Sequence, residues 1–151
     1  MGRDDKPMRD GEMVPEITNN SKDIEFLDEK VFQYNFSKIG KYEYQDIAFC
    51  IRDPQANIIG GISGHTGLGW LYIHGLWIAE KFRGEGYGIR LLEAAEKEAF
   101  DRGCHSAYLY SYDFQAPSFY EKAGYRRVAT LPDFPTGHQK VYLTKRLQND
   151  V

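Results

Sequence analysis

A cluster of glycines between two regular patterns constrains this chain more than any other feature. Gly84, Gly86 and Gly88 follow an apolar stretch at residues 70–78, which predicts a strand. After them comes a helical pattern of apolar residues at three-and-four spacing: Ile89, Leu92, Ala95 and Ala99. Glycines at such a junction let several backbone N–H groups converge at the positive end of the helix. The sequence therefore predicts a pyrophosphate site built from main chain.

Two other phosphate-binding motifs fit these glycines poorly. A dinucleotide fingerprint needs a third glycine three residues after the second, and Ile89 or Leu91 occupies that position. A P-loop would end in Gly-Lys-Ser/Thr, whereas Gly88 is followed by Ile89. The pattern that remains is Arg83-x-x-Gly86-x-Gly88.

This remaining pattern resembles a motif of the GNAT superfamily of acetyl-CoA-dependent N-acetyltransferases. A second segment, Asp-Phe-Gln-Ala-Pro-Ser-Phe-Tyr-Glu-Lys-Ala-Gly-Tyr at residues 113–125, is similar to the superfamily's later motif, Asn-x-x-Ala-x-x-Leu/Phe-Tyr-x-Lys-x-Gly-Phe/Tyr. The two motifs occur in the expected order, separated by one helix and one strand. The resemblance extends over residues 12–147, nearly the whole chain.

The element order predicts an α/β (α+β) fold: a single GNAT domain with a mixed, mostly antiparallel sheet and helices on both faces. Strands are expected at residues 13–18, 44–52, 58–65, 70–78, 108–111, 126–131 and 140–147. Helices are expected from Asn20 or Ser21 to Gly40, from the glycine loop to Arg102, and at residues 117–123. The domain should span residues 12–147, between a flexible tail at residues 1–11 and a C-terminal tail at residues 148–151.

Charge and composition narrow the class of partner. With a net charge of -3 the chain offers no broad basic surface for nucleic acid. No apolar run approaches the ~20 residues of a membrane span, and residues 1–10 lack the apolar region of a signal peptide. Cys50 and Cys104 are expected to be buried, reduced thiols. We therefore expect a cytoplasmic protein without a metal cluster, and a homodimer is left open.

The resemblance implies that acetyl-CoA is the acyl-donor substrate, and it assigns the contacts. Main-chain groups of Leu76, Trp77 and Ile78 would hold the pantetheine arm and the thioester carbonyl. The pyrophosphate would lie against the main chain of Arg83, Gly84, Glu85, Gly86, Tyr87 and Gly88. The Glu85 carboxylate should point to solvent, while Arg83 either binds phosphate or caps its own loop.

The second motif implies further donor contacts at Asp113, Pro117 and Tyr120. The family commonly has Asn where Asp113 stands, and an ionised carboxylate cannot donate a hydrogen bond as an amide can. Tyr120 occupies the position from which a phenol gives its proton to the leaving thiolate. With a reference pKa of ~10 the phenol is protonated at neutral pH. The alternative is an amphipathic tyrosine of the core.

The general base is less defined by the sequence. Many family members carry Glu at the position of Tyr72, so this chain departs from that pattern. Strand alternation predicts that Tyr72, His74, Leu76 and Ile78 share a face, unless a bulge near Gly75 changes it. His74 is then a candidate base or water relay, with a packing histidine as the alternative.

The acceptor pocket is expected between the first helix and the last loop, with Tyr34, Tyr72, His74 and His138 as candidate contacts. The alternative is that His138 is simply a turn residue beside Gly137. The sequence thus predicts transfer of acetyl from acetyl-CoA to a primary amine of a small-molecule acceptor, by direct attack in a ternary complex. The alternatives are a non-catalytic acyl-CoA-binding or sensor domain and a nucleotide-phosphate binder.

Overall fold

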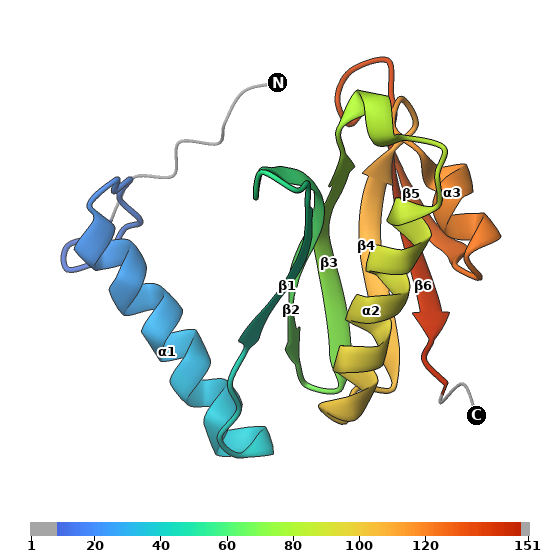
Figure 1. The fold of residues 1–151 in the computed structure, drawn as a ribbon. Coiled ribbons are helices and arrows are strands. Elements are labelled where there is room, and N and C mark those ends of the chain that lie inside the picture. Colours follow the sequence, from blue (N-terminus) through green and yellow to red (C-terminus); the bar gives the residue numbers. More distant parts are fainter. Residues whose placement is uncertain (1–8, 149–151) are drawn as a thin grey trace. The chain divides into compact units, whose positions relative to one another are not determined.

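The computed structural model describes residues 9–148, which form two compact units that divide between Lys41 and Tyr42. The first unit contains α1 (Ser21–Ile39), drawn in blue in Figure 1. Asn20 caps this helix by accepting a hydrogen bond from the Lys22 N–H at 2.9 Å, and Gly40 ends it with φ of 81°. The helix predicted from the capping residues is therefore confirmed.

The strand predicted at residues 13–18 is wrong. Residues 12–20 carry no strand hydrogen bonding in the structure, and the side chains of Met13 and Ile17 are almost fully exposed. A strand needs a neighbour to satisfy its backbone groups, and this segment has none among the described residues. The apolar residues of this segment therefore do not occupy positions in the sheet.

The second unit is a six-stranded sheet with the order β1-β2-β3-β4-β6-β5 (Figure 1). Its strands are β1 (Gln45–Arg52), β2 (Ile58–Gly67), β3 (Trp70–Ile78), β4 (Ser106–Tyr112), β5 (Arg126–Pro132) and β6 (Gln139–Arg146). Its helical segments are the 3-10 turn η1 (Glu80–Phe82), α2 (Tyr87–Asp101) and α3 (Pro117–Lys122). Only the β3–β4 pair is parallel, so the mixed, mostly antiparallel sheet is confirmed.

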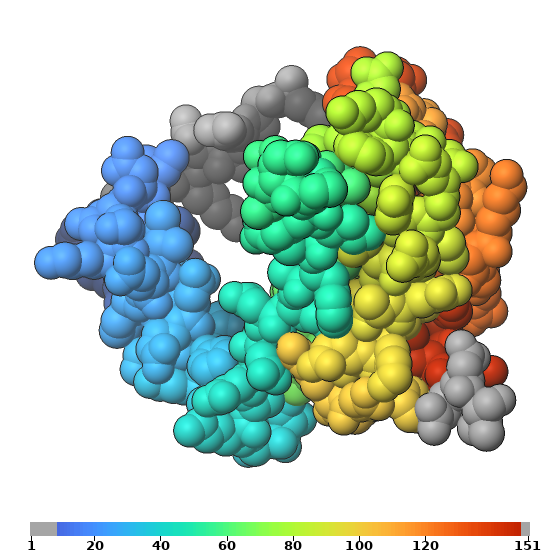
Figure 2. Space-filling model, viewed as in Figure 1, coloured from blue at the N-terminus to red at the C-terminus, as the bar shows by residue number. Residues whose placement is uncertain are grey.

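The core lies between one face of the sheet and α2. The helix turns Leu91, Leu92, Ala95 and Ala99 toward the strands, and Leu92 and Ala99 have no exposed surface. They meet buried side chains of the central strands: Leu71, Ile73, Ala107, Leu109, Val141 and Leu143. In Figure 2 the atoms of the glycine loop and α2, coloured yellow-green to yellow, form a continuous layer over this part of the molecule. Burial of this stripe fixes α2, and with it the glycine loop that precedes the helix.

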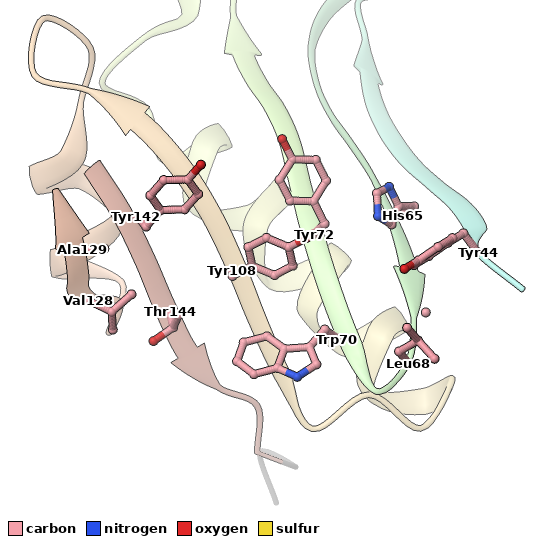
Figure 3. Close-up of a pocket in the computed structure, with 11 residues that line it drawn as sticks. Tyr44, His65, Leu68, Trp70, Tyr72, Tyr108, Val128, Ala129, Tyr142 and Thr144 are labelled. Carbon is pink, nitrogen blue, oxygen red and sulfur yellow. The ribbon is translucent and has the colours of Figure 1, made fainter. Parts of the chain in front are cut away.

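The opposite face of the central strands carries aromatic rings instead of aliphatic side chains. Tyr72, Tyr108 and Tyr142 project from β3, β4 and β6 on this side (Figure 3). The Tyr72 and Tyr108 ring centroids are 5.0 Å apart, and Trp70 meets Tyr108 edge-on at 5.8 Å. The alternation of strand residues therefore separates an aliphatic core face from an aromatic face.

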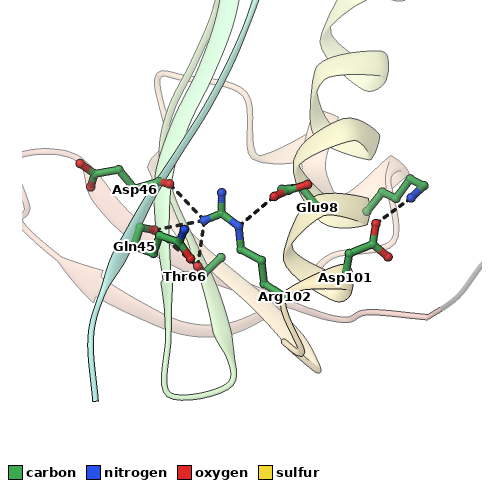
Figure 4. Close-up of polar contacts among 7 residues, drawn as sticks. Gln45, Asp46, Thr66, Glu98, Asp101 and Arg102 are labelled. Carbon is green, nitrogen blue, oxygen red and sulfur yellow. Dashed lines mark hydrogen bonds and ion pairs between the residues drawn. The ribbon is translucent and has the colours of Figure 1, made fainter. Parts of the chain in front are cut away.

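Arg102 ties the end of α2 to the first two strands (Figure 4). Its Nε bonds the Glu98 carboxylate at 3.0 Å, and its Nη1 donates to the Asp46 carbonyl at 3.0 Å and the Thr66 hydroxyl at 3.2 Å. The Arg102 side chain is only 21% exposed, so these bonds replace hydrogen bonds to water that the guanidinium has lost. The sequence pattern placed Arg102 at the helix end but gave no sign of this role.

The expectation of two buried thiols is wrong for one of them. Both cysteines are free, but Cys50 is exposed whereas Cys104 is buried. Cys50 lies on the edge strand β1, where β2 is the only neighbour among the described strands. Burial raises the pKa of the Cys104 thiol above its usual value, so this side chain acts as a small apolar core residue.

Candidate active site

The glycine loop, the ends of β3 and β4 and the start of α3 line a cavity of about 640 Å³. We call it the donor cavity, after the role proposed for it in the next subsection. From β3 and β4 it takes His74, Gly75, Leu76, Ile78, Tyr110, Ser111 and Tyr112. From η1, the glycine loop and α2 it takes Phe82, Arg83, Gly84, Gly86, Tyr87, Gly88 and Ile89. From α3 and the residues before it come Gln115, Ala116, Phe119 and Tyr120. Both sequence motifs thus contribute to one cavity.

The cavity lies where two parallel strands separate. β3 and β4 pair at only three positions, the last of which joins Tyr72 to Tyr108. Farther along, Leu76 and Ile78 of β3 face the cavity from one side and Ser111 of β4 from the other. A sheet that opens in this way leaves backbone groups of β3 available to a ligand instead of to a neighbouring strand.

A β-bulge in β3 changes which residues share a face. Ser63 of β2 pairs with Gly75 and Gly64 pairs with Ile73, so His74 is the extra residue without a partner in the ladder. Gly64 permits the bulge, because a Cβ there would collide with the Tyr72 carbonyl oxygen.

The common face expected for these four residues of β3 is therefore wrong, and the stated alternative, a bulge near Gly75, is confirmed. Leu76 and Ile78 pack against the core cluster, on the same side as Leu71 and Ile73. Tyr72 and His74 stay together on the other side, with ring centroids 6.4 Å apart. The extra residue shifts the alternation by one position, which moves the later part of the strand to the opposite face.

The glycine loop leads directly into α2 and leaves its first amides available. Gly84 and Gly86 adopt φ of 78° and 85°, a backbone conformation that glycine tolerates without strain. Helical bonding begins with the Arg90 N–H, which donates to the Gly86 carbonyl at 3.2 Å. The preceding N–H groups, of Tyr87, Gly88 and Ile89, have no intrahelical partner, and all three residues line the cavity. This arrangement can bind an anion by main chain alone.

The two charged side chains of the loop behave differently. Arg83 donates from Nε to the Ile78 carbonyl at 2.9 Å, so in the structure it caps its own loop, as one of its two predicted roles requires. Glu85 is exposed and does not line the cavity. The Glu85 carboxylate is therefore not part of the cavity wall that would bind an anion.

Tyr120 reaches the cavity from α3, within a cluster of aromatic rings. Its ring centroid lies 5.1 Å from that of Phe119 and 5.8 Å from that of Tyr125. Burial raises the pKa of the Tyr120 phenol above its usual value. The hydroxyl is therefore protonated throughout the neutral range and is available as a hydrogen-bond donor.

The comparisons with known proteins agree with this geometry. The profile of the "Acetyltransferase (GNAT) family" matches residues 14–125. The chain belongs to the GNAT family. It is 35% identical over 113 residues to acetyltransferase Atu2258 of Agrobacterium fabrum, covering 75% of this chain and 82% of that protein. It is also 39% identical over 94 residues to the blasticidin-S acetyltransferase of Streptomyces morookaense, covering 62% of this chain and 69% of that protein.

A solved structure gives the same result for the fold. An acetyltransferase from Bacillus cereus ATCC 14579 superposes with a TM-score of 0.82 at 34% identity, covering 90% of this chain and 98% of that one. This GNAT chain is therefore an acetyltransferase. The resemblance inferred from the two motifs is confirmed.

A second cavity, of about 530 Å³, lies on the aromatic face of the GNAT sheet (Figure 3). We call it the aromatic cavity. Its lining residues come from the position before β1, from the β2–β3 turn and from the five strands β2 to β6: Tyr44, His65, Gly67, Leu68, Trp70, Tyr72, Tyr108, Val128, Ala129, Tyr142 and Thr144. Tyr72 lines this cavity and not the donor cavity. Burial, with Tyr110 nearby, raises the pKa of Tyr72 to about 12, so this phenol is neutral.

Asp113 and His138 form a pair that the sequence did not predict. His138 Nδ1 lies 2.9 Å from Asp113 Oδ1, and the Gln139 N–H donates to Asp113 Oδ2 at 3.0 Å. Both carboxylate oxygens thus have partners, one in the loop before β6 and one at the first residue of β6, which gives Asp113 a role that an asparagine would fill less well. Neither residue lines the donor cavity.

Three other predicted contacts also lie outside this lining. Trp77 is 53% exposed on β3, and Pro117 is buried at the start of α3. Tyr34 belongs to α1 in the first unit. Only backbone contacts were predicted for Trp77, and these remain untested.

The donor cavity is also lined by residues that sequence reasoning missed, among them those on β4. Tyr110 and Tyr112 follow the strand alternation, but nothing in their spacing distinguishes them from packing residues. Gln115 is fixed by the Tyr112 N–H, which donates to its Oε1 at 2.9 Å.

Within residues 9–148, no group of three His, Cys, Asp or Glu side chains is placed to hold a metal ion. None of the helices in the described part of the chain combines the length and apolar character needed to cross a bilayer.

Proposed function

We propose that this acetyltransferase transfers the acetyl group of acetyl-CoA to a primary amine of a small-molecule acceptor, by direct attack within a ternary complex. One observation carries the proposal. The open end of the β3–β4 pair, the free amides at the start of α2 and the Tyr120 phenol meet in a single cavity of about 640 Å³. These are three elements that amine acylation by a thioester needs: a donor site, an anion site and an acid.

The donor fits the residues present. The N–H groups of Tyr87, Gly88 and Ile89 offer a bidentate or tridentate anion site for the pyrophosphate of coenzyme A. Backbone groups along Leu76–Ile78 would accept the pantetheine arm, because β4 does not pair with β3 there. An N–H of this segment directed at the thioester carbonyl would stabilise the oxyanion, an effect worth ~3 kcal/mol in related acyl transfers.

Tyr120 is proposed as the acid. As the amine nitrogen bonds to the carbonyl carbon and the C–S bond breaks, the sulfur becomes negative and accepts the phenolic proton. The burial that raises the pKa of Tyr120 keeps the phenol protonated and also makes proton loss harder. Donation is therefore expected only as charge develops on the sulfur.

His74 is proposed as the base that takes the proton from the attacking amine. The bulge turns it out of the ladder, its side chain is exposed, and it lines the cavity on the side where Tyr72 lies. Bulges commonly re-aim side chains next to active sites. An acceptor arriving from the aromatic face would meet His74 before the thioester.

Two further points complete the proposal. A small-molecule acceptor is supported by the relative named blasticidin-S acetyltransferase, whose name identifies the molecule it acetylates. The free state of Cys50 and Cys104 suits a reducing compartment such as the cytoplasm. Recovery of the native protein in a membrane or secreted fraction would contradict a cytoplasmic location.

Thiol release from acetyl-CoA, measured across a panel of amines that includes blasticidin S, tests the function directly. The expected result is amine-dependent release with an acetylated product seen by mass spectrometry. Coenzyme A binding by calorimetry without any turnover would instead support the acyl-CoA sensor. A preference for ATP or NAD over coenzyme A in the same titration would contradict the donor site itself.

A further inference from the structure

Lys140 at the start of β6 holds its ammonium group within a cluster of aromatic rings. Its Nζ lies 3.8 Å from the ring centroid of Tyr110, 4.4 Å from that of Phe134 and 5.5 Å from that of Tyr142. These rings come from β4, from the loop after β5 and from β6. Three ring faces around one ammonium fix its position far better than a single surface contact would.

No carboxylate pairs with this ammonium within the described chain. Across residues 9–148 the lysine ion pairs are Lys97–Asp101 and Lys145–Glu96, and the Lys140 side chain makes neither an ion pair nor a hydrogen bond. Asp113, near Lys140 in the sheet, is already engaged by His138 and the Gln139 N–H. Aromatic rings attract a cation through their quadrupole but carry no net charge. The ammonium is therefore held by aromatic rings, without a carboxylate paired directly to it.

This charge lies next to the proposed site of amine attack. Tyr110, the ring nearest to the ammonium, lines the donor cavity together with His74. The same ring lies 6.4 Å from Tyr72, which lines the aromatic cavity. Lys140 itself lines neither cavity, but its ammonium lies against the Tyr110 ring and is therefore close to an acceptor that reaches His74 from the aromatic face.

We infer that Lys140 determines acceptor specificity by favouring amines that also carry an anionic group, either a carboxylate or a phosphate. The ammonium attracts such a group and repels a second positive charge, so polycationic amines are poor acceptors. The inference rests on the proposed amine acetylation, and it adds the class of acceptor, which neither the family nor the motifs specify.

The test compares pairs of acceptors in which only one member carries an anionic group. The kcat/KM values for β-alanine and β-alaninamide, aminomethylbenzoate and its amide, and phosphoethanolamine and ethanolamine are measured with the wild type, Lys140→Met and Lys140→Arg. The carboxylate and phosphate pairs separate the two kinds of anion. Lys97→Met, which removes one positive charge from an exposed site on α2, is the control.

The wild type should prefer the anionic member of at least one pair by about tenfold, as expected for one charge-assisted contact. Lys140→Met should abolish the preference, whereas Lys140→Arg and Lys97→Met should keep it. A ratio taken within one variant cancels any loss of folded protein. An unchanged ratio in Lys140→Met would overturn the inference while leaving acetyl transfer intact. Absence of turnover with every amine, by contrast, would overturn the proposed function and this inference together.

Discussion

The donor cavity at the opened end of the β3–β4 pair and the aromatic cavity on one face of the sheet are built by different means. The donor cavity takes seven lining residues, three of them glycines, from the continuous segment at residues 82–89, and the others from β3, β4 and the region of α3. The aromatic cavity is lined by side chains from five strands that are far apart in the sequence. Tyr72 lies on the aromatic side and His74, at the bulge between the two sides, contacts Tyr72 and lines the donor cavity.

This difference suggests a division of labour. A main-chain site depends on local conformation, so it suits a donor shared by a whole family. A side-chain site changes with every substitution on its strands, so it suits the acceptor that varies between members. Changes on the donor side should therefore affect coenzyme affinity or chemistry, and changes on the aromatic side should affect acceptor binding.

The largest effect is expected for Tyr120→Phe. Loss of the acid should lower kcat by roughly 10²–10⁴-fold, the usual contribution of a general acid, with coenzyme A affinity nearly unchanged. Steady-state thiol release and calorimetry measure the two quantities. Tyr125→Phe is the matched control, since its ring lies 5.8 Å from Tyr120 but outside the cavity lining. Unchanged turnover in Tyr120→Phe would remove the acid role.

Gly86→Val should weaken coenzyme A binding by about tenfold or more. A β-branched residue at φ of 85° is strained by ~1–3 kcal/mol, and the loop can relax only by moving its amides away from the anion. Gly103→Val is the control, because Gly103 has φ of 91°, also has no atom near its missing Cβ, and lies at the far end of α2. Equal coenzyme affinity in the two variants would count against the main-chain site.

Tyr72→Leu should raise the acceptor KM by about two- to tenfold without changing coenzyme A affinity, because aromatic contacts on this face are worth ~0.5–1.5 kcal/mol each. Tyr72→Phe keeps the ring and should retain most of the acceptor affinity. Since the pKa of Tyr72 is raised to about 12, this phenol does not ionise in the working range. The Phe variant should therefore leave the pH profile of kcat/KM unchanged below about pH 10. A shifted alkaline limb would show that Tyr72 titrates during turnover.

The smallest effect is on stability. The Tyr125 hydroxyl is buried and has no hydrogen-bond partner in the described chain, so Tyr125→Phe should be neutral or stabilise the fold by up to ~1 kcal/mol. Burial raises the pKa of Tyr125, so the folded state keeps a proton that the unfolded state loses above about pH 10. Wild-type stability should therefore fall as the pH rises past that value, and less so in the variant. Urea unfolding at about pH 8 and about pH 10.5 measures the difference, and a marked destabilisation at the lower pH would reveal a hydroxyl partner.

The sequence predicted the elements on either side of the glycine loop because their signals are local. The strand at residues 70–78, the glycine loop and the helix after it follow from residue spacing within one continuous stretch, whereas the role expected of Tyr120 came from the resemblance to the family. Backbone φ values at Gly84 and Gly86, in particular, depend mainly on neighbouring residues along the chain. A motif can encode such a site because its parts are consecutive.

The tertiary structure decided what depends on pairing between distant segments. It placed the extra residue of the β3 bulge at His74, which moved Leu76 and Ile78 to the core face. It also joined Asp113 to His138, 25 positions apart, and brought Lys140 onto the ring of Tyr110. Register and cross-strand contact are set by packing free energy summed over the whole sheet. Residue spacing along one strand therefore could not reveal them.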